Sequence, residues 1–208
     1  MQADYDATTA LIVVDVQNDF TDPAGSLSVA GGDAIVPYLN GQIAAALAAG
    51  AVVAYTRDWH PPSTPHFATG GGPWPVHCVA GTWGAAFHPD LTTNAGPSVR
   101  KGANGEDGYS GFTMRDPLTG TTVPTELDGI LRGRGIRRVV VGGLATDYCV
   151  RDTALDAAGL GYRTSVLLEG VRAVDLQPGD GAAALSALLE AGVELVPSSG
   201  AAAKDGAQ

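Results

Sequence analysis

Cysteine is scarce in this chain: Cys78 and Cys149 are the only two among 208 residues. Two cysteines cannot form the disulfide framework that stabilises small secreted proteins. We therefore expect both to be reduced thiols and the protein to be cytoplasmic.

Basic residues are also few, with 12 Lys and Arg against 22 Asp and Glu, which gives a net charge of −10. They form no cluster beyond short pairs such as Arg137-Arg138. Nucleic acids and anionic membranes favour basic surfaces, so we expect neither as a partner. A small-molecule substrate fits this composition better, and a homo-oligomer stays an open alternative.

Long apolar runs are missing as well. The longest apolar stretch, IAAALAAGAVVAY, is shorter than the ~20 residues that cross a bilayer, and Gly50 interrupts it. The first ten residues, MQADYDATTA, have neither the basic segment nor the apolar core of a signal peptide. The sequence thus predicts a soluble, acidic protein.

What the chain does contain is a regular alternation of apolar strands and helices. Strands are expected over 10–16, 51–58, 98–102, 136–145, 162–170 and 193–196. Helices are expected over 31–50, 124–135, 146–161 and 178–192, with Asp33, Thr125 and Thr146 as candidate N-caps. This alternation predicts an α/β fold, a three-layer α/β/α arrangement around a mainly parallel central sheet of about six strands.

One domain is expected over residues 1–197, followed by a disordered small and polar tail over 198–208. Residues 59–96 are rich in Pro, Gly, Trp and His and show little periodicity. So long an irregular segment in a compact domain is more often functional than idle. In parallel sheets, ligands bind at the C-terminal ends of strands, so reactive side chains are expected there.

Cys149 follows the apolar run VVVGGLA and opens a predicted helix. The first turn of a helix favours negative charge and can lower a thiol pKa from ~8.5 into the range of ~3.5–7.5. Backbone amides at such a turn can also hold an oxyanion. Cys149 is therefore a candidate nucleophile, although a free cysteine is equally often a small buried hydrophobe.

Cys78, in PVHCVAG, is the rival nucleophile because it lies beside His77. Neighbouring residues in an extended loop point in different directions, so they seldom form a Cys–His pair. A packing role is the better interpretation of Cys78.

A thiol nucleophile needs a base and a group that balances its charge. Asp15 ends the first strand, where burial can raise the pKa of a carboxyl group. Lys101 ends SVRKG and can pair with both the thiolate and the carboxylate. The alternatives are a turn-capping carboxylate and an ordinary surface lysine.

A second group of polar residues lies in RDWHPPSTPHFATGGGPWPVHC. It contains Asp58, His60, His66 and His77, and an Asp-x-His pair places two ligands on one side of an extended chain. Mixed N/O ligands suit Zn²⁺, Fe²⁺ or Mn²⁺ rather than Ca²⁺. The alternative is a set of separate loop histidines. We interpret the fourth histidine, His88, as structural.

Taken together and in this order, the motifs resemble the nicotinamidase branch of the isochorismatase-like cysteine hydrolases. The resemblance covers nearly the whole chain through LIVVDVQNDF, RDWHP, WPVHCVAGTWGAAFHP, RKGAN, YSGF, GLATDYCVRDTALDA and VELV. The first and the penultimate of these motifs are quite specific.

The resemblance implies a role for each candidate. Asp15, Lys101 and Cys149 match the catalytic triad, which decides against Cys78. Asp58, His60 and His77 match the metal ligands, with His66 as a further ligand in some members. Other implied features are a cis peptide at Leu144–Ala145, an oxyanion hole of the Ala145 and Cys149 amides, and a substrate pocket of Phe20, Trp74, Tyr109 and Tyr148.

The implied activity is hydrolysis of nicotinamide to nicotinate and ammonia through a cysteine thioester, with a metal ion that positions the pyridine ring. The implied cofactor is a divalent metal, zinc or iron, with manganese as a third candidate. Two alternatives are another small-amide or carbamoyl amidohydrolase of the same superfamily and a non-catalytic binding member. The Asp-x-His pair with its distant histidine favours the first interpretation.

Overall fold

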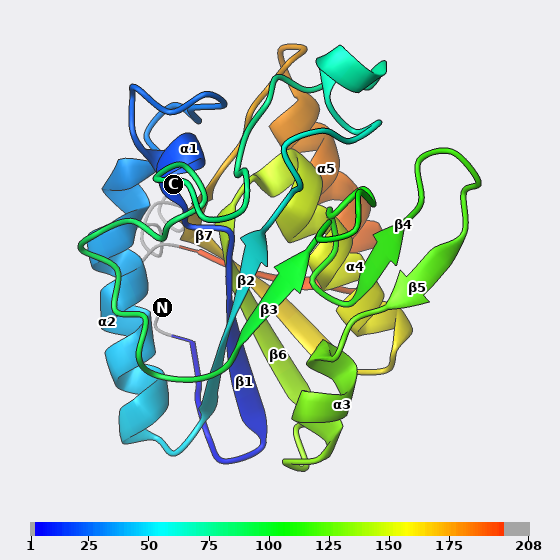
Figure 1. Ribbon diagram of the computed structural model, residues 1–208. Helices are drawn as coiled ribbons and strands as arrows, with labels where there is room; N and C mark the ends of the chain where they lie inside the picture. The colour runs from blue at the N-terminus through cyan, green and yellow to red at the C-terminus, as the bar shows by residue number, and fades with distance from the viewer. Residues whose placement is uncertain (1–2, 198–208) are drawn as a thin grey trace, which may run out of the picture.

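A six-stranded sheet with the order β3-β2-β1-β6-β7-β8 forms the centre of the molecule in the computed structural model, which describes residues 3–197 (Figure 1). Every neighbouring pair of strands in it is parallel. The strands are β1 (Thr9–Val14), β2 (Val52–Asp58), β3 (Ser98–Lys101), β6 (Arg138–Leu144), β7 (Arg163–Arg172) and β8 (Glu194–Val196). The predicted α/β fold with a mainly parallel sheet is confirmed.

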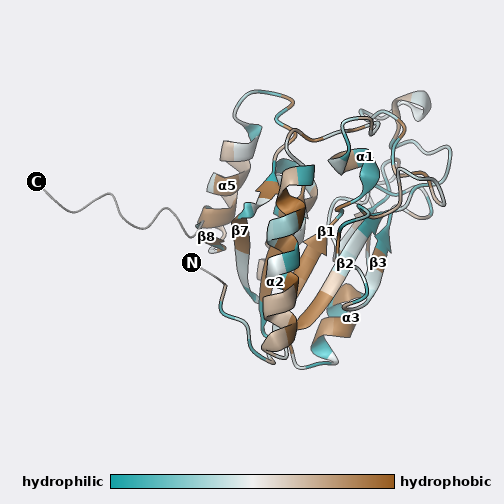
Figure 2. Cartoon of the chain, turned by 90° about the vertical axis from the view of Figure 1, so that its left-hand side faces the viewer, coloured by the Kyte–Doolittle hydropathy of each residue, from teal (hydrophilic) through white to brown (hydrophobic). Residues whose placement is uncertain are grey.

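Helices cover both faces of this sheet. The helices are α1 (Asn18–Thr21), α2 (Val36–Ala48), α3 (Leu127–Arg132), α4 (Arg151–Gly159) and α5 (Asp180–Glu190). Helix α2 packs on one face, against β1, β2 and β7, whereas α4 packs on the other, against β6 and β7 (Figure 1). Since both faces are covered, all six residues of β1 are buried, and most of them are apolar, which gives the strand its hydrophobic colour in Figure 2.

The strand order reverses between β1 and β6. From β1 the chain proceeds outward through β2 to β3, and from β6 it proceeds in the opposite direction through β7 to β8. This is the topological switch point, where α/β sheets bind ligands beyond the strand ends. Asp15 follows β1 and Ala145 follows β6, so two candidate site residues lie at this point.

Gly143 allows β1 and β6 to approach closely beside the switch point. Its φ is +126°, and a Cβ atom there would lie only 2.0 Å from the carbonyl oxygen of Val14. The pairing of β6 with β7 also shifts register between Val141 and Gly143. Only glycine fits this backbone without displacing its neighbour.

None of the three predicted caps is the N-cap residue in the structure, and two of them make no capping bond. Asp33 begins a short 3₁₀ turn, η1 (Asp33–Ile35), and makes no capping bond to α2. Thr146 lies inside a turn of π-helix, η3 (Thr146–Val150), which Ala145 precedes without a side-chain cap. Thr125 precedes Glu126, the N-cap residue of α3, and its hydroxyl accepts the amide of Leu127 at 3.2 Å. At Asp33 and Thr146 an extra turn displaces the start of the regular α-helix.

Three short elements were not predicted. They are α1, the 3₁₀ turn η2 (Ala68–Gly70), and the antiparallel hairpin of β4 (Thr113–Arg115) and β5 (Thr122–Pro124). The tail expected over 198–208 lies outside the described residues. Within residues 3–197, no helix combines the length and apolar character needed to cross a membrane.

Candidate active site

Asp15, Lys101 and Cys149 lie together beyond the C-terminal ends of the central strands. The Lys101 Nζ atom is 2.6 Å from Asp15 Oδ2 and 3.4 Å from Cys149 Sγ. Ligand-type atoms of Asp15, Asp58 and Cys149 lie within 4.8 Å of one another. The structure thus brings together an acid, an amine and a thiol that are far apart in the sequence.

Asp15 is completely buried, and its backbone has a positive φ of +48°. Its Oδ1 accepts the hydroxyl of Thr56 at 2.6 Å, while Oδ2 faces Lys101. Burial raises the pKa of Asp15 to about 6, and the Lys101 charge limits the rise. A carboxyl group with this pKa is ionised at neutral pH and can still be protonated during a reaction.

Lys101 is the charge centre of this group. It is fully buried and also contacts Asp58 Oδ1 at 2.9 Å. Burial alone would favour the neutral amine, but the two carboxylates outweigh burial and raise the pKa of Lys101 well above its usual value. Its ammonium also donates to the backbone carbonyls of Gly108 and Tyr109. Lys101 is therefore a fixed cation, which excludes the surface-lysine alternative.

Cys149 lies in η3, directly after β6, and is 6% exposed. The lowering of the thiol pKa that a helix start can produce is outweighed here. Burial raises the pKa of Cys149 well above its ordinary value, and the neighbouring carboxylates add to this effect while Lys101 opposes it. The resting thiol is therefore protonated, so a thiolate has to form by proton transfer within the site.

The peptide bond between Leu144 and Ala145 is cis, as the resemblance implied. Ala145 and Cys149 both line the same pocket. The candidate oxyanion residues therefore lie beside the thiol.

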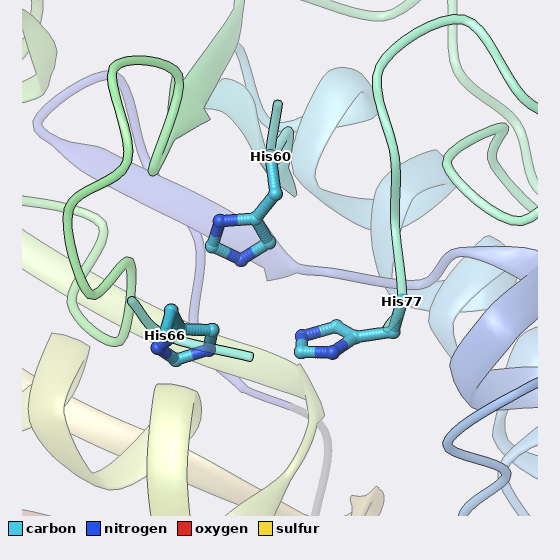
Figure 3. Close-up of side chains that lie close together, drawn as sticks. All are labelled: His60, His66 and His77. Atoms are coloured by element: carbon cyan, nitrogen blue, oxygen red, sulfur yellow. The ribbon is translucent and has the colours of Figure 1, made fainter. Parts of the chain in front are cut away.

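Three histidine side chains point toward one another near Asp58 (Figure 3). Each of His60, His66 and His77 offers a ring nitrogen, and these nitrogens lie within 4.8 Å of one another. Asp58 Oδ2 is 3.7 Å from Nε2 of His60 and 3.5 Å from Nε2 of His77. All four residues are buried, and the structure thus assembles the predicted metal group.

The donor set fits a divalent metal ion. Neither ring nitrogen of His60 has a hydrogen-bond partner among the described residues, although the side chain is fully buried. His77 Nδ1 contacts the Pro75 carbonyl at 2.8 Å, which leaves Nε2 as a free acceptor. Burial lowers the pKa of His66, and this favours the neutral imidazole that binds metals. Buried polar atoms without partners are costly, and a bound metal would satisfy one of the two His60 ring nitrogens.

Asp58 belongs to both groups. Burial opposes its ionisation, but Lys101 and the histidines outweigh burial and hold the pKa of this carboxyl group well below its usual value. One oxygen faces Lys101 and the other faces the histidines. A permanent anion therefore connects the triad to the metal group.

An aromatic pocket opens above these groups. Phe20, Trp74, Tyr109 and Tyr148 line it together with Cys149 and two of the histidines. Trp74 Nε1 donates to the Tyr109 hydroxyl at 2.7 Å, and the Trp74 ring meets the Tyr148 ring edge-on at 4.8 Å between centroids. Flat aromatic walls of this kind suit a planar ring.

Cys78 and His88, which were predicted to have no catalytic role, lie outside the candidate active site. The Cys78 amide donates to Asp19 Oδ2 at 2.7 Å, and its Sγ atom faces the Gly84 carbonyl. His88 Nδ1 accepts the amide of Asp90 at 3.1 Å in a local turn. Both interactions agree with packing and structural roles.

Several supporting side chains were not found by sequence reasoning. Gln17 binds both the amide and the carbonyl of Asp58 at 2.8 Å, and Asp147 accepts the amides of Val174 and Asp175. The others are Asp19, Thr56 and Asp107, which contact Cys78, Asp15 and His66 respectively. The signal that could have pointed to some of them is closeness to a candidate site residue in the sequence. Gln17 and Asp19 lie in VQND, just after Asp15, and Asp147 lies in TDYC, just before Cys149.

The fold and the site together define an α/β enzyme with a buried thiol at the switch point of a parallel sheet. The profile of the isochorismatase domain matches residues 9–198. The chain therefore belongs to the isochorismatase family.

Named relatives agree with this assignment. The nicotinamidase/pyrazinamidase of Mycobacterium tuberculosis is 46% identical over 200 residues, which cover 91% of this chain and 99% of that protein. The pyrazinamidase of Pyrococcus horikoshii in complex with zinc is 41% identical with a TM-score of 0.81, and covers 91% of this chain and 99% of its own. PnC1 from L. infantum in complex with nicotinate is 37% identical with a TM-score of 0.85, and covers 96% of this chain and 98% of its own.

Proposed function

We propose that this protein hydrolyses nicotinamide to nicotinate and ammonia through a thioester on Cys149. The observation that carries the proposal is that Lys101 contacts both the Cys149 thiol and the Asp15 carboxylate, and that Cys149 lines a pocket shared with two of the histidines. Similarity to nicotinamidases and to a nicotinate complex supports the choice of substrate.

Asp15 acts as the general base. Its raised pKa of about 6 leaves it ionised at neutral pH, whereas the pKa of the Cys149 thiol is well above normal. A thiolate formed before attack would therefore be rare, so proton transfer to Asp15 accompanies attack of sulfur on the carboxamide carbon. Lys101 stays protonated and balances the charge that develops on sulfur.

The carbonyl oxygen becomes negative as the sulfur–carbon bond forms. In our proposal, the amides of Ala145 and Cys149 donate to this oxyanion. One missing donor of this type typically costs ~10²–10³ in rate. The tetrahedral intermediate then collapses: the carbon–nitrogen bond breaks, and the proton held by Asp15 passes to the nitrogen, so that ammonia leaves.

Hydrolysis of the thioester repeats the same proton movements. Asp15, now ionised, takes a proton from a water molecule while the water oxygen attacks the thioester carbon. The carbon–sulfur bond breaks, sulfur regains a proton from Asp15, and the acid product loses its remaining proton to solvent as nicotinate is released.

Asp58, His60, His66 and His77 would hold a divalent metal, and we propose zinc or iron, with manganese as a third candidate. A metal bound there supplies a Lewis-acidic site for the pyridine nitrogen and so orients the ring. Phe20, Trp74, Tyr109 and Tyr148 enclose the ring and exclude water. Productive orientation of this kind can lower the activation free energy by several kcal/mol.

The test is an ammonia-release assay on nicotinamide, pyrazinamide and a panel of small carbamoyl compounds, with and without a chelator. We expect turnover of nicotinamide that falls when the chelator removes the metal. Turnover of carbamoyl compounds alone would favour the other amidohydrolase of the superfamily. No turnover of any amide by the metal-loaded protein would overturn the proposal.

We also propose that the protein acts in the cytoplasm. Cys78 and Cys149 are both free and buried, which agrees with a reducing compartment. Fractionation of cells that express the natural protein checks this location, and light scattering checks whether it forms a homo-oligomer.

A further inference from the structure

We propose that Asp107 is a positioning residue for the metal group, which acts by fixing the imidazole of His66. The inference rests on the proposed metal site and assigns a role to a side chain outside the predicted ligand set. Asp107 lies in the loop between β3 and β4 and is 9% exposed.

The contact itself is short and directional. Asp107 Oδ1 lies 2.6 Å from His66 Nδ1, and both side chains are buried. An ionised carboxylate only accepts hydrogen bonds, so Nδ1 carries the hydrogen and Nε2 keeps its lone pair. A carboxylate in this position sets the ring orientation and raises the basicity of the nitrogen that binds the metal.

The three histidines differ in what supports them. His77 donates to the neutral carbonyl of Pro75, and His60 has no hydrogen-bond partner on either ring nitrogen within residues 3–197. Asp58 lies 3.5 to 3.7 Å from the Nε2 atoms of His77 and His60, whereas His66 has a carboxylate hydrogen-bonded to Nδ1 at 2.6 Å. Its affinity for a cation should therefore depend most on its partner.

Asp107 is itself firmly held. Its backbone pairs with that of Arg115 in both directions, at 2.7 and 3.2 Å. Two residues earlier in each loop, the Thr64 hydroxyl donates to the Gly105 carbonyl at 2.8 Å. Two parallel contacts, Thr64 with Gly105 and His66 with Asp107, therefore join the histidine segment to the β3–β4 loop.

The residues after Asp107 extend this connection into the active site. The Gly108 carbonyl accepts the Lys101 ammonium, and the Tyr109 ring meets the His66 ring at 5.6 Å between centroids. A change in how Asp107 holds His66 should therefore affect metal affinity first. The effect on Lys101 should be secondary, because Gly108 and Tyr109 keep their own contacts.

The competing interpretation is that Asp107 only stabilises the β4–β5 hairpin. Arg115 Nη1 lies 3.5 Å from Asp107 Oδ2, but the Arg115 side chain is 59% exposed, so this ion pair is well screened. A hairpin role predicts a loss of thermal stability without a specific loss of metal affinity.

The first experiment measures zinc affinity of the full-length protein without substrate, by competition with a chromophoric chelator. We expect Asp107→Ala to weaken zinc binding 10- to 100-fold, the usual effect of losing such a partner. Asp107→Asn, which can still accept the bond but lacks the charge, should fall between this variant and the wild type. Asp116→Ala is the matched control: Asp116 lies in the same hairpin and only accepts amides of its own turn, so affinity should not change.

The second experiment combines the change with His66→Ala. If Asp107 acts through His66, then Asp107→Ala should have no further effect on zinc affinity in the His66→Ala background. An equal loss in both backgrounds, or unchanged affinity in Asp107→Ala or His66→Ala alone, would overturn the inference. If Asp107→Ala fails to fold, the same comparison is made with Asp107→Asn. Because no substrate is present, failure here leaves the nicotinamide assay to decide the proposed function separately.

Discussion

In the proposed mechanism a single proton moves between two buried residues, Asp15 and Cys149, and their surroundings determine where it rests. Both groups lose water on folding, and burial favours the neutral form of each. Lys101 stays charged because it faces two carboxylates. At rest the thiol holds the proton and Asp15 is ready to accept it.

The pH dependence of the reaction should reflect Asp15. Its pKa of about 6 is raised from 3.8, so the fraction able to accept a proton falls as the pH drops through 6. We expect kcat/KM for nicotinamide to fall on the acid side with a midpoint near pH 6. Metal content measured at every pH separates this effect from loss of the ion. A midpoint near 4 in fully loaded protein would contradict the assignment.

Thr56 offers a way to move this midpoint. Its hydroxyl donates to Asp15 at 2.6 Å and favours the ionised carboxylate. Thr56→Val keeps the shape of the side chain but removes the donor. The acid limb should therefore move to higher pH, as a pH–rate profile of the variant would show.

Cys149 and Cys78 provide a matched pair of substitutions. Cys149→Ala should reduce turnover by about 10⁴-fold or more, because it removes the proposed nucleophile. It should still bind nicotinate, which calorimetry would detect. Cys78→Ala should keep turnover, since Cys78 contacts Asp19 and Gly84 outside the triad. The opposite pattern would exchange the roles of the two cysteines.

The sequence allowed Asp15, Lys101 and Cys149 to be chosen by the strand ends at which they occur. It did not allow Thr56, Gln17 or Asp107 to be chosen, because each acts through a contact with a residue far away in the chain. It also did not reveal that the pKa of the Cys149 thiol is raised. Helix position can be read locally, whereas burial and two neighbouring carboxylates depend on the tertiary structure.

At the scale of elements, apolar runs and their length predicted the six strands of the sheet and the main helices. The hairpin of β4 and β5 was missed because each strand has only three residues and β5 is exposed, so it gives no apolar pattern. The turn of π-helix before α4 was also missed. Its residues resemble an ordinary helix start in sequence, and the π-helical turn directly after β6 is evident only in the structure.

Gly143 in β6 leaves no room for a side chain. A Cβ atom would meet both the carbonyl oxygen of Val14 at 2.0 Å and its amide nitrogen at 2.6 Å, with φ already positive. We expect Gly143→Ala to lower the free energy of unfolding by about 2–5 kcal/mol, measured by denaturant titration.

Gly41 is the control for this substitution. It is exposed within α2, and a Cβ atom there would meet no described atom within 4 Å. Gly41→Ala should stabilise the protein by about 0.5–1 kcal/mol through helix propensity. Equal effects at the two glycines would show that the close approach of β1 and β6 is not the cause.

At the scale of the whole molecule, the site depends on the sheet order. Asp15 and Ala145 lie at the same end of neighbouring strands because β1 and β6 pair at the switch point, although 130 positions separate them in the sequence. The rule that ligands bind at strand ends located this region from sequence. The order of the strands, and with it the way the irregular segment over 59–96 covers the site, could not be derived without the fold.

Removal of the metal should destabilise the whole protein. A ligand that binds only the folded state adds about 2.7 kcal/mol at a free concentration of 100 times its Kd. For a chain of this size that corresponds to a shift of about 5–10 °C in Tm. Thermal unfolding with and without zinc should show this shift in the wild type and in His88→Ala. In His60→Ala the shift should be lost, and a full shift there would exclude His60 as a ligand.

Oδ1 of Asp58 contacts the Lys101 ammonium, and Oδ2 faces the histidines. A compound that removes a metal ion from the proposed site would therefore also change the surroundings of the carboxylate that pairs with Lys101. Under the proposed mechanism, we expect metal-chelating inhibitors to affect the Lys101 environment as well as the metal group, and we expect substitution of Asp58 to impair both.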